Sequence, residues 1–96
     1  MAKFGVAKKP YDYLAEIALR HKILRRKAGF SQSELAKRSG VSLGSLKRFE
    51  ATGQISLESL LKLMEMLDHL HDFDLVLKPL ENLKEIEKLF SDKTRI

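Results

Sequence analysis

The chain has 96 residues and no cysteine; 44% of its residues are apolar, and its formal net charge at pH 7 is +5. This length suits one small domain, and because a single core of this size is only marginally stable, dimerisation is a natural source of further burial. The lack of cysteine excludes disulfide bonds, thiolate catalysis and thiolate metal sites. No apolar run approaches the ~20 residues that cross a bilayer, and the N-terminal residues lack a signal core, so we expect a cytoplasmic protein.

Charge is distributed unevenly along the chain. Residues 1–48 hold twelve Lys or Arg against three acids, whereas residues 49–96 hold six against ten. A run of like charge is usually a solvated surface. A basic half favours a polyanionic partner only where it coincides with a surface shaped to bind one.

The first 28 residues predict a basic arm followed by a helix. Residues 1–9 contain three lysines and no periodicity, so they form an arm that can follow a phosphate backbone or enter a minor groove. Pro10 suits a helix entrance, Gly29 suits its C-terminal stop, and the helix is predicted over residues 10–28. The side chains expected on its inner face are Leu14, Ile17, His21, Leu24 and Ala28.

Two short amphipathic helices are predicted next, over residues 32–39 and 43–51. Ser31 and Ser42 each precede a helix as the capping residue, and Gly40 permits the tight turn between the helices. Leu46 and Phe49 are three residues apart on the inner face of the second helix. Its outer face carries Gly44, Ser45, Lys47 and Arg48. Two helices joined by one turn, with a polar and basic outer face, can enter a DNA major groove.

The last third of the chain predicts one further helix and an ambiguous extension. After a cap at Ser56, the apolar stripe of this helix is expected to consist of Leu57, Leu60, Leu61, Met64 and Leu67. The side chains expected in the core are Leu60, Leu63, Met64 and Leu67. Residues 73–77 alternate in a way that favours a short strand, although Leu70, Phe73 and Leu77 also have helical spacing. Helical spacing returns over residues 80–90. We therefore divide the chain into residues 1–9 (arm), 10–68 (DNA-binding domain) and 69–96 (extension for dimerisation or partner binding).

From Leu24 to Leu67 the sequence resembles the lambda-repressor-like (Cro/Xre-type) helix-turn-helix family. The motif is Leu-Arg-x-x-Ala-Gly-Phe-Ser-Gln-x-Glu-Leu-Ala-x-x-Ser-Gly-Val-Ser-x-x-x-Leu-x-x-Phe-Glu, beginning at Leu24. The resemblance implies an all-α fold of four to five helices, a homodimer, and repression by operator binding. A short C-terminal strand can then pair across the dimer.

The resemblance also implies roles for particular residues. Base-contacting positions are Leu43, Gly44, Ser45, Lys47 and Arg48, and phosphate-contacting positions are Gln32, Ser31, Lys37 and Ser42. Arg25 and Glu50 match a structural ion pair of the fold. Arg48 is the leading base reader, because a guanidinium can bond guanine O6 and N7 together. Relatives often carry glutamine where Leu43 and Gly44 stand, so few direct readers remain and DNA shape should contribute to specificity.

A narrower resemblance begins at Ser45 and extends to Asp74. This stretch of sequence is similar to that of HipB-type antitoxins, which repress their own operon and accompany HipA-type serine/threonine kinases. It implies a bacterial, cytoplasmic protein that joins the nucleoid when bound to DNA. In some of these proteins a C-terminal strand from each subunit pairs across the dimer axis, which suits Phe73, Leu75 and Leu77 as interface residues.

Enzymatic readings have little support in the sequence. His69 and His71 are two residues apart, so on a helix they would point in different directions and make a poor ligand pair. No Gly-rich phosphate loop, Ser/His/Asp set or paired-carboxylate spacing is present. We therefore expect no catalysis, no metal and no cofactor. The competing reading is a protein-interaction module, because the second half holds more apolar residues than four small helices need.

Overall fold

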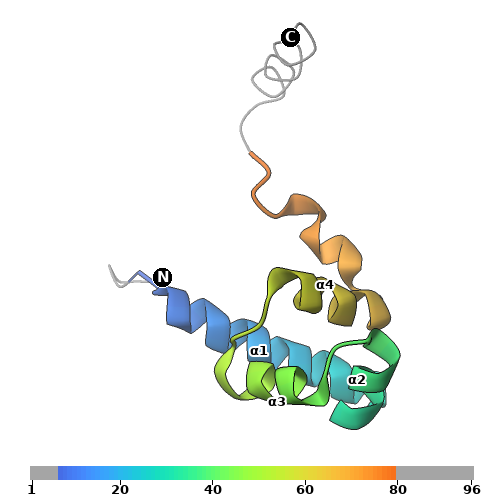
Figure 1. Cartoon of the computed structure of the whole chain (residues 1–96). Coiled ribbons are helices and arrows are strands. Elements are labelled where there is room, and N and C mark those ends of the chain that lie inside the picture. Colours follow the sequence, from blue (N-terminus) through green and yellow to red (C-terminus); the bar gives the residue numbers. More distant parts are fainter. Residues whose placement is uncertain (1–6, 80–96) are drawn as a thin grey trace, which may run out of the picture.

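The computed structural model describes residues 7–79 of the chain, and these residues form helices only. The elements in chain order are α1 (Pro10–Lys27), α2 (Gln32–Ser39), α3 (Leu43–Thr52), α4 (Leu57–Met66) and the 3-10 helix η1 (Leu70–Leu75). In Figure 1, α3 lies beside α1, and η1 leads away from the helical body after α4; α2 packs against both α3 and α4. The predicted all-α fold is confirmed.

Three of the four α-helices begin at a serine whose hydroxyl accepts a backbone amide of the first turn. Ser31 Oγ accepts from Glu34 N, Ser42 Oγ from Ser45 N and Ser56 Oγ from Ser59 N, each at 3.1 Å. These bonds satisfy amides that would otherwise lack a partner at a helix start. Local chemistry therefore fixes the helix boundaries.

The core lies where α2, α3 and α4 meet α1. Its largest fully buried apolar side chains are Leu35, Leu46, Phe49 and Leu63. The core residues predicted on α4 are confirmed, because all four are buried. The wider stripe is confirmed only in part, since Leu57 is 65% exposed and Leu61 is half-buried. Burying a leucine or phenylalanine side chain contributes about 1.5–3 kcal/mol, so this small cluster supplies much of the stability of the domain.

The buried face of α1 differs from the predicted one. Of the five side chains predicted there, Leu14 and Ile17 are each 39% exposed, Ala28 is exposed and Leu24 is half-buried; His21 is buried as predicted. Ala18 and Arg25 are buried as well, so two polar side chains, His21 and Arg25, lie on this face. The helix is rotated toward these two polar side chains because both of them bond to a carboxylate on α3. An apolar pattern alone does not contain that information.

The short strand favoured over residues 73–77 is not found, and the helical alternative is closer to the structure. Residues 70–75 form η1, and the chain then turns, with the Lys78 amide donating to the Leu75 carbonyl and Leu77 at a φ of +63°. A 3-10 helix has three residues per turn, so the spacing from Leu70 to Phe73 suits it, and Phe73 packs against the core. The partner predicted for this strand was the same segment of a second subunit, and residues 7–79 of one chain contain no other strand with which it could pair.

Two sequence predictions fall partly or wholly outside the described residues. They are the basic arm over residues 1–9, of which residues 7–9 are described, and the helical spacing over residues 80–90.

Candidate nucleic-acid interface

The turn between α2 and α3 is set by Gly40. Its φ of +80° lies in the left-handed region, and its amide donates to the Ala36 carbonyl at the end of α2. L-residues with a Cβ rarely adopt this conformation, whereas glycine does so at little cost. Val41 is buried directly after the turn, and the chain re-enters helix at Leu43. The sharp connection places the start of α3 beside the body of α2.

The two faces of α3 differ completely in exposure. Leu46 and Phe49 are buried at 0% and 1% exposure. Leu43 is half-buried, and the exposed residues are Gly44, Ser45, Lys47 and Arg48. A Cβ placed at Gly44 would meet no atom within 4 Å, so the backbone there is open to a partner. The structure therefore brings the predicted base-contacting residues together on one exposed helix face.

Residues predicted to contact phosphate lie around this face. Ser31 and Ser42 are the capping residues of α2 and α3, and Lys37 is exposed on α2. The Ser42 hydroxyl also donates to Ser45 Oγ at 2.9 Å, which joins a predicted phosphate contact to a predicted base contact. Serine hydroxyls used as caps keep further hydrogen-bonding capacity, since each can donate once and accept twice.

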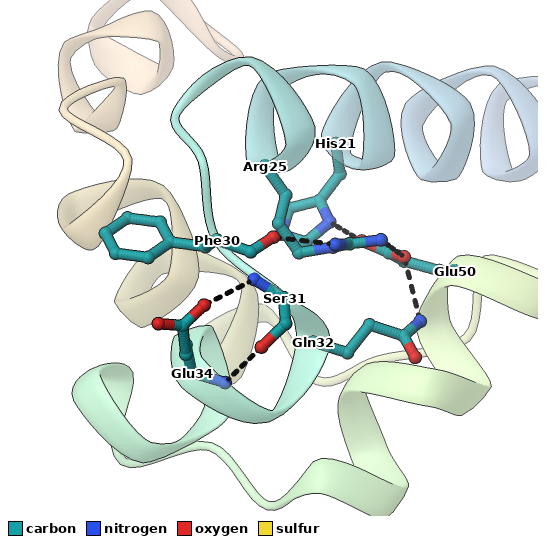
Figure 2. A network of polar contacts seen from close by, with 7 residues as sticks. All are labelled: His21, Arg25, Phe30, Ser31, Gln32, Glu34 and Glu50. Atoms are coloured by element: carbon teal, nitrogen blue, oxygen red, sulfur yellow. Dashed lines mark hydrogen bonds and ion pairs between the residues drawn. The ribbon is translucent and has the colours of Figure 1, made fainter.

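Glu50, near the end of α3, is the centre of a buried polar network (Figure 2). Its Oε2 accepts from Arg25 Nε and from His21 Nδ1, both at 2.8 Å. Its Oε1 accepts from Arg25 Nη2 at 2.9 Å and from Gln32 Nε2 at 3.0 Å. Arg25 Nη1 donates to the Phe30 carbonyl at 2.8 Å. This one carboxylate therefore joins α1, α2 and α3.

The network sets the charge states of its members. Burial by itself raises the pKa of Glu50, but hydrogen bonds from Arg25 and Gln32 outweigh it and hold that pKa below its ordinary value. Burial lowers the pKa of His21, although the Glu50 carboxylate opposes this effect. The lowered pKa favours the neutral form of His21, and the 2.8 Å contact between its Nδ1 and the Glu50 carboxylate requires that the proton be on Nδ1. Its Nε2 is buried and finds no hydrogen-bond partner among residues 7–79.

The lowered pKa of His21 predicts a pH dependence of stability. Because the folded state holds this pKa below its ordinary value of 6.5, the unfolded state binds more protons as pH falls below 6.5. We expect the free energy of unfolding to decline from about pH 6.5 toward the folded-state pKa. Urea denaturation at a series of pH values from 7.5 to 5 measures this decline. The variant His21→Gln does not titrate, so an equal decline in that variant would refute the assignment.

Gln32 lies at the first position of α2, and its side chain bonds inward. One N–H of its amide donates to Glu50, which leaves the second N–H and the amide oxygen for other partners. The Gln32 side chain therefore connects the start of α2 to the end of α3. Any contact made by the second N–H would be held in place by Glu50.

Comparison with known proteins yields one family. The helix-turn-helix family model matches residues 22–72, which is more than half of the chain. The chain belongs to the lambda-repressor-like (Cro/C1-type) helix-turn-helix family. No curated protein and no solved structure matches it. The family is one of DNA-binding domains and not of enzymes. The matched residues include α2 and α3, which form the helix-turn-helix; the second helix of this motif is called the recognition helix in the family.

Two hydrogen-bond partners were not predicted from the sequence, namely His21 as a partner of Glu50 and Gln54 as a partner of Arg48. His21 was expected at the core edge, and its position four residues before Arg25 could have indicated that both face Glu50. Gln54, in the loop after the recognition helix, accepts a hydrogen bond from Arg48 Nη2. No sequence signal indicated that bond, because the loop conformation decides which side chains meet.

His69, which directly precedes η1, and His71 within it also lie differently from their prediction. Their rings stack, with centroids 5.9 Å apart, and both approach the Asp72 carboxylate. The tighter winding of a 3-10 helix changes the direction of side chains two residues apart relative to an α-helix. Within the part of the chain that the structure describes, no group of three or more His, Asp or Glu side chains is arranged to hold a metal ion. None of the helices found there is long and apolar enough to traverse a membrane.

Proposed function

We propose that this protein is a sequence-specific regulator of transcription that binds double-stranded DNA as a homodimer and represses its own operon. The recognition helix α3 enters the major groove, where base edges carry a distinct pattern of donors and acceptors. The observation that carries the proposal is the exposed face formed by Gly44, Ser45, Lys47 and Arg48, in a chain whose family binds DNA. Residues 10–68 bind DNA in this proposal, and residues 69–96 form the dimer.

Specific bases are read mainly by Arg48. Its guanidinium can donate to guanine O6 and N7 together. Ser45 contacts a base through its shorter side chain, and Lys47 reaches either a base or a phosphate. Leu43 packs on a thymine methyl group, and Gly44 lets the helix backbone approach the bases closely. With so few direct readers, two half-sites and the shape of the DNA supply the remaining specificity.

The DNA backbone is held around the recognition helix. Gln32 donates its second amide N–H to a phosphate at the start of α2, where the free amides and the helix dipole favour an anion. Ser31, Ser42 and Lys37 contact neighbouring phosphates. These contacts set the register of the protein on the duplex and carry no sequence information.

The dimer forms through the surface around η1. Leu75 is 66% exposed and Leu77 is 98% exposed, while Phe73 is half-buried. Exposed apolar side chains gathered in one place usually mark an interface. This surface belongs to η1 and the turn after it, and the recognition helix contributes none of these residues, so a dimer made here leaves α3 free for DNA.

The resemblance to HipB-type proteins extends the proposal to a protein partner. In that case a HipA-type serine/threonine kinase, encoded beside this gene in a bacterium, binds the less basic half of the chain. The protein then acts in the cytoplasm, as an antitoxin when bound to the kinase and as a repressor when bound to DNA. Co-purification with the product of the adjacent gene tests this extension, and its failure removes the kinase.

The proposed function is tested first by binding to the DNA upstream of the protein's own gene, beside a scrambled duplex of equal length. Both duplexes are titrated at 50 mM and 150 mM salt. Tight binding that persists at the higher salt on the upstream duplex alone supports a specific repressor. Weak binding to both duplexes that is lost together as salt rises would indicate only nonspecific electrostatic binding by a basic surface, and it would contradict the proposed function.

Substitutions of a base-contacting residue and of a phosphate-contacting residue should have different effects on DNA binding. We expect Arg48→Ala to cost about 1–3 kcal/mol of binding free energy on the specific duplex and almost nothing on the scrambled one. Lys37→Ala should weaken binding to both duplexes and reduce the salt slope by about one. Fluorescence anisotropy at several salt concentrations measures both effects. Equal losses on the two duplexes for Arg48→Ala would contradict its role as a base reader.

One observation favours a second function, binding of a protein partner with DNA binding secondary. A groove of about 520 Å³ lies between α1, α4 and η1, and its walls include Ile17, Leu24, Met64 and Phe73. Grooves of this size and apolar character bind ligands or partner side chains. Association through such a groove depends weakly on salt, so the same salt series separates the two functions.

A further inference from the structure

Gln54 lies outside the recognition helix but is bonded to its principal side chain. Arg48 Nη2 donates to Gln54 Oε1. This bond uses one of the five N–H groups of the guanidinium, so the others can still form the bidentate pair with a guanine. Because the bond is made before any DNA is present, Arg48 does not have to be ordered entirely at the moment of binding.

The backbone that carries Gln54 is itself held in place. Thr52 Oγ1 donates to the Arg48 carbonyl at 2.7 Å and accepts from the Gln54 amide at 3.1 Å. These two bonds join the end of α3 to the loop, so the residue that carries the guanidinium and the residue that accepts from it are connected through one hydroxyl group.

Close packing against α1 adds a second, independent constraint. Gly53 ends α3 with a φ of +83°, and a Cβ built on it would lie 2.5 Å from Leu14 Cβ and 2.7 Å from the Leu14 carbonyl oxygen. The loop backbone therefore lies directly on α1, with no room for a side chain between them. The position of the next residue, Gln54, is set by the core of the domain.

Arg48 and Gln54 line a shared hollow at the edge of the recognition helix. Its volume is about 290 Å³, and its other walls include Ser45, Ser56 and Ser59. The hollow thus borders two of the residues proposed to contact bases and the start of α4. The bond between Arg48 and Gln54 therefore lies beside Ser45, another residue proposed to contact bases.

We propose that Gln54 determines specificity by positioning the Arg48 guanidinium for one base pair. The inference rests on the proposed function, since it requires that Arg48 reads a base. Gln54 acts through Arg48 and is therefore a positioning residue. Pre-organising a flexible side chain reduces the ordering cost of binding, and this gain is realised only where the fixed geometry matches the base.

The test is a double-mutant cycle measured as the ratio of affinities for the specific and scrambled duplexes. Gln54→Ala and Gln54→Met both remove the acceptor, and each should lower the ratio about tenfold while leaving scrambled binding unchanged. In an Arg48→Ala background the same changes should have no further effect. Gln54→Glu keeps the acceptor, so it should preserve the ratio while weakening binding to both duplexes through its charge.

Ser59→Ala provides the matched control, because Ser59 lines the same hollow and its hydroxyl makes no hydrogen bond with Arg48 among the described residues. It should leave the ratio unchanged. Thermal melting verifies that each variant is folded, as expected for the exposed Gln54 side chain. A tenfold loss that persists without Arg48, or equal losses on both duplexes, would overturn the inference. Should the wild-type protein bind both duplexes alike, the proposed function fails and the inference fails with it.

Discussion

Glu50→Ala is expected to lower the free energy of unfolding by about 3–5 kcal/mol, because it leaves a buried charge without its partner. The Glu50 carboxylate accepts four hydrogen bonds, two from Arg25 and one each from His21 and Gln32. Arg25 is only 6% exposed and His21 only 1% exposed, so neither can exchange its lost bond for water without the helices moving. Urea denaturation followed by circular dichroism at pH 7.5 measures the loss.

Glu58→Ala is the control for this prediction. Glu58 is an acid on α4 whose ion pair with Lys62, at 3.5 Å, lies in solvent, with the Glu58 side chain 82% exposed. An exposed pair of this type contributes about 0.3–0.5 kcal/mol. If Glu50→Ala costs no more than Glu58→Ala, then the network does not hold the three helices together as argued.

Gly53→Ala is the second substitution with a large expected effect, about 2–5 kcal/mol of unfolding free energy. An L-residue at a φ of +83° costs about 1–2 kcal/mol, and forcing atoms into a filled space costs about 1–3 kcal/mol more. The added methyl group would meet the backbone of Leu14, and backbone cannot rotate away as a side chain can. The midpoint of urea unfolding measures the change.

Gly29→Ala separates the two contributions. Gly29 has nearly the same φ, +86°, but a Cβ there would meet no atom within 4 Å. We expect Gly29→Ala to lower the free energy of unfolding only by the cost of placing an L-residue at a positive φ, about 1–2 kcal/mol. If both variants lose the same stability, the close approach of the α3–α4 loop to α1 is refuted, and with it one support for the fixed position of Gln54.

Helix boundaries were predictable because their causes are local. Residues 32–39 were predicted as a helix and form α2, and the helix predicted from residue 43 to 51 ends one residue later, at Thr52. A serine at the start and a glycine at the end act on amides and carbonyls within four residues, so a single sequence contains all that is needed. The chain motif also indicated the family correctly, since it spans the same helices.

The prediction for residues 73–77 failed because alternation is only a local signal. The same residues fit a period of two and a period near three, and the choice between them depends on what lies opposite. Phe73 can pack against the core only if the chain coils, whereas a strand needs a partner that residues 7–79 do not supply.

The sequence by itself determined the two capped helices with their glycine turn, the residues on the outer face of α3, and the family. Only the tertiary structure decided that His21 and Gln32 share the carboxylate of Glu50, and that Gln54 holds Arg48. Arg48 and Gln54 are only 6 residues apart, and they meet because of the conformation of the loop after α3. For the contacts of Glu50, the physical reason is distance along the chain. Capping and turn formation act between neighbours, whereas His21 and Glu50 are 29 residues apart and meet only once three helices have packed.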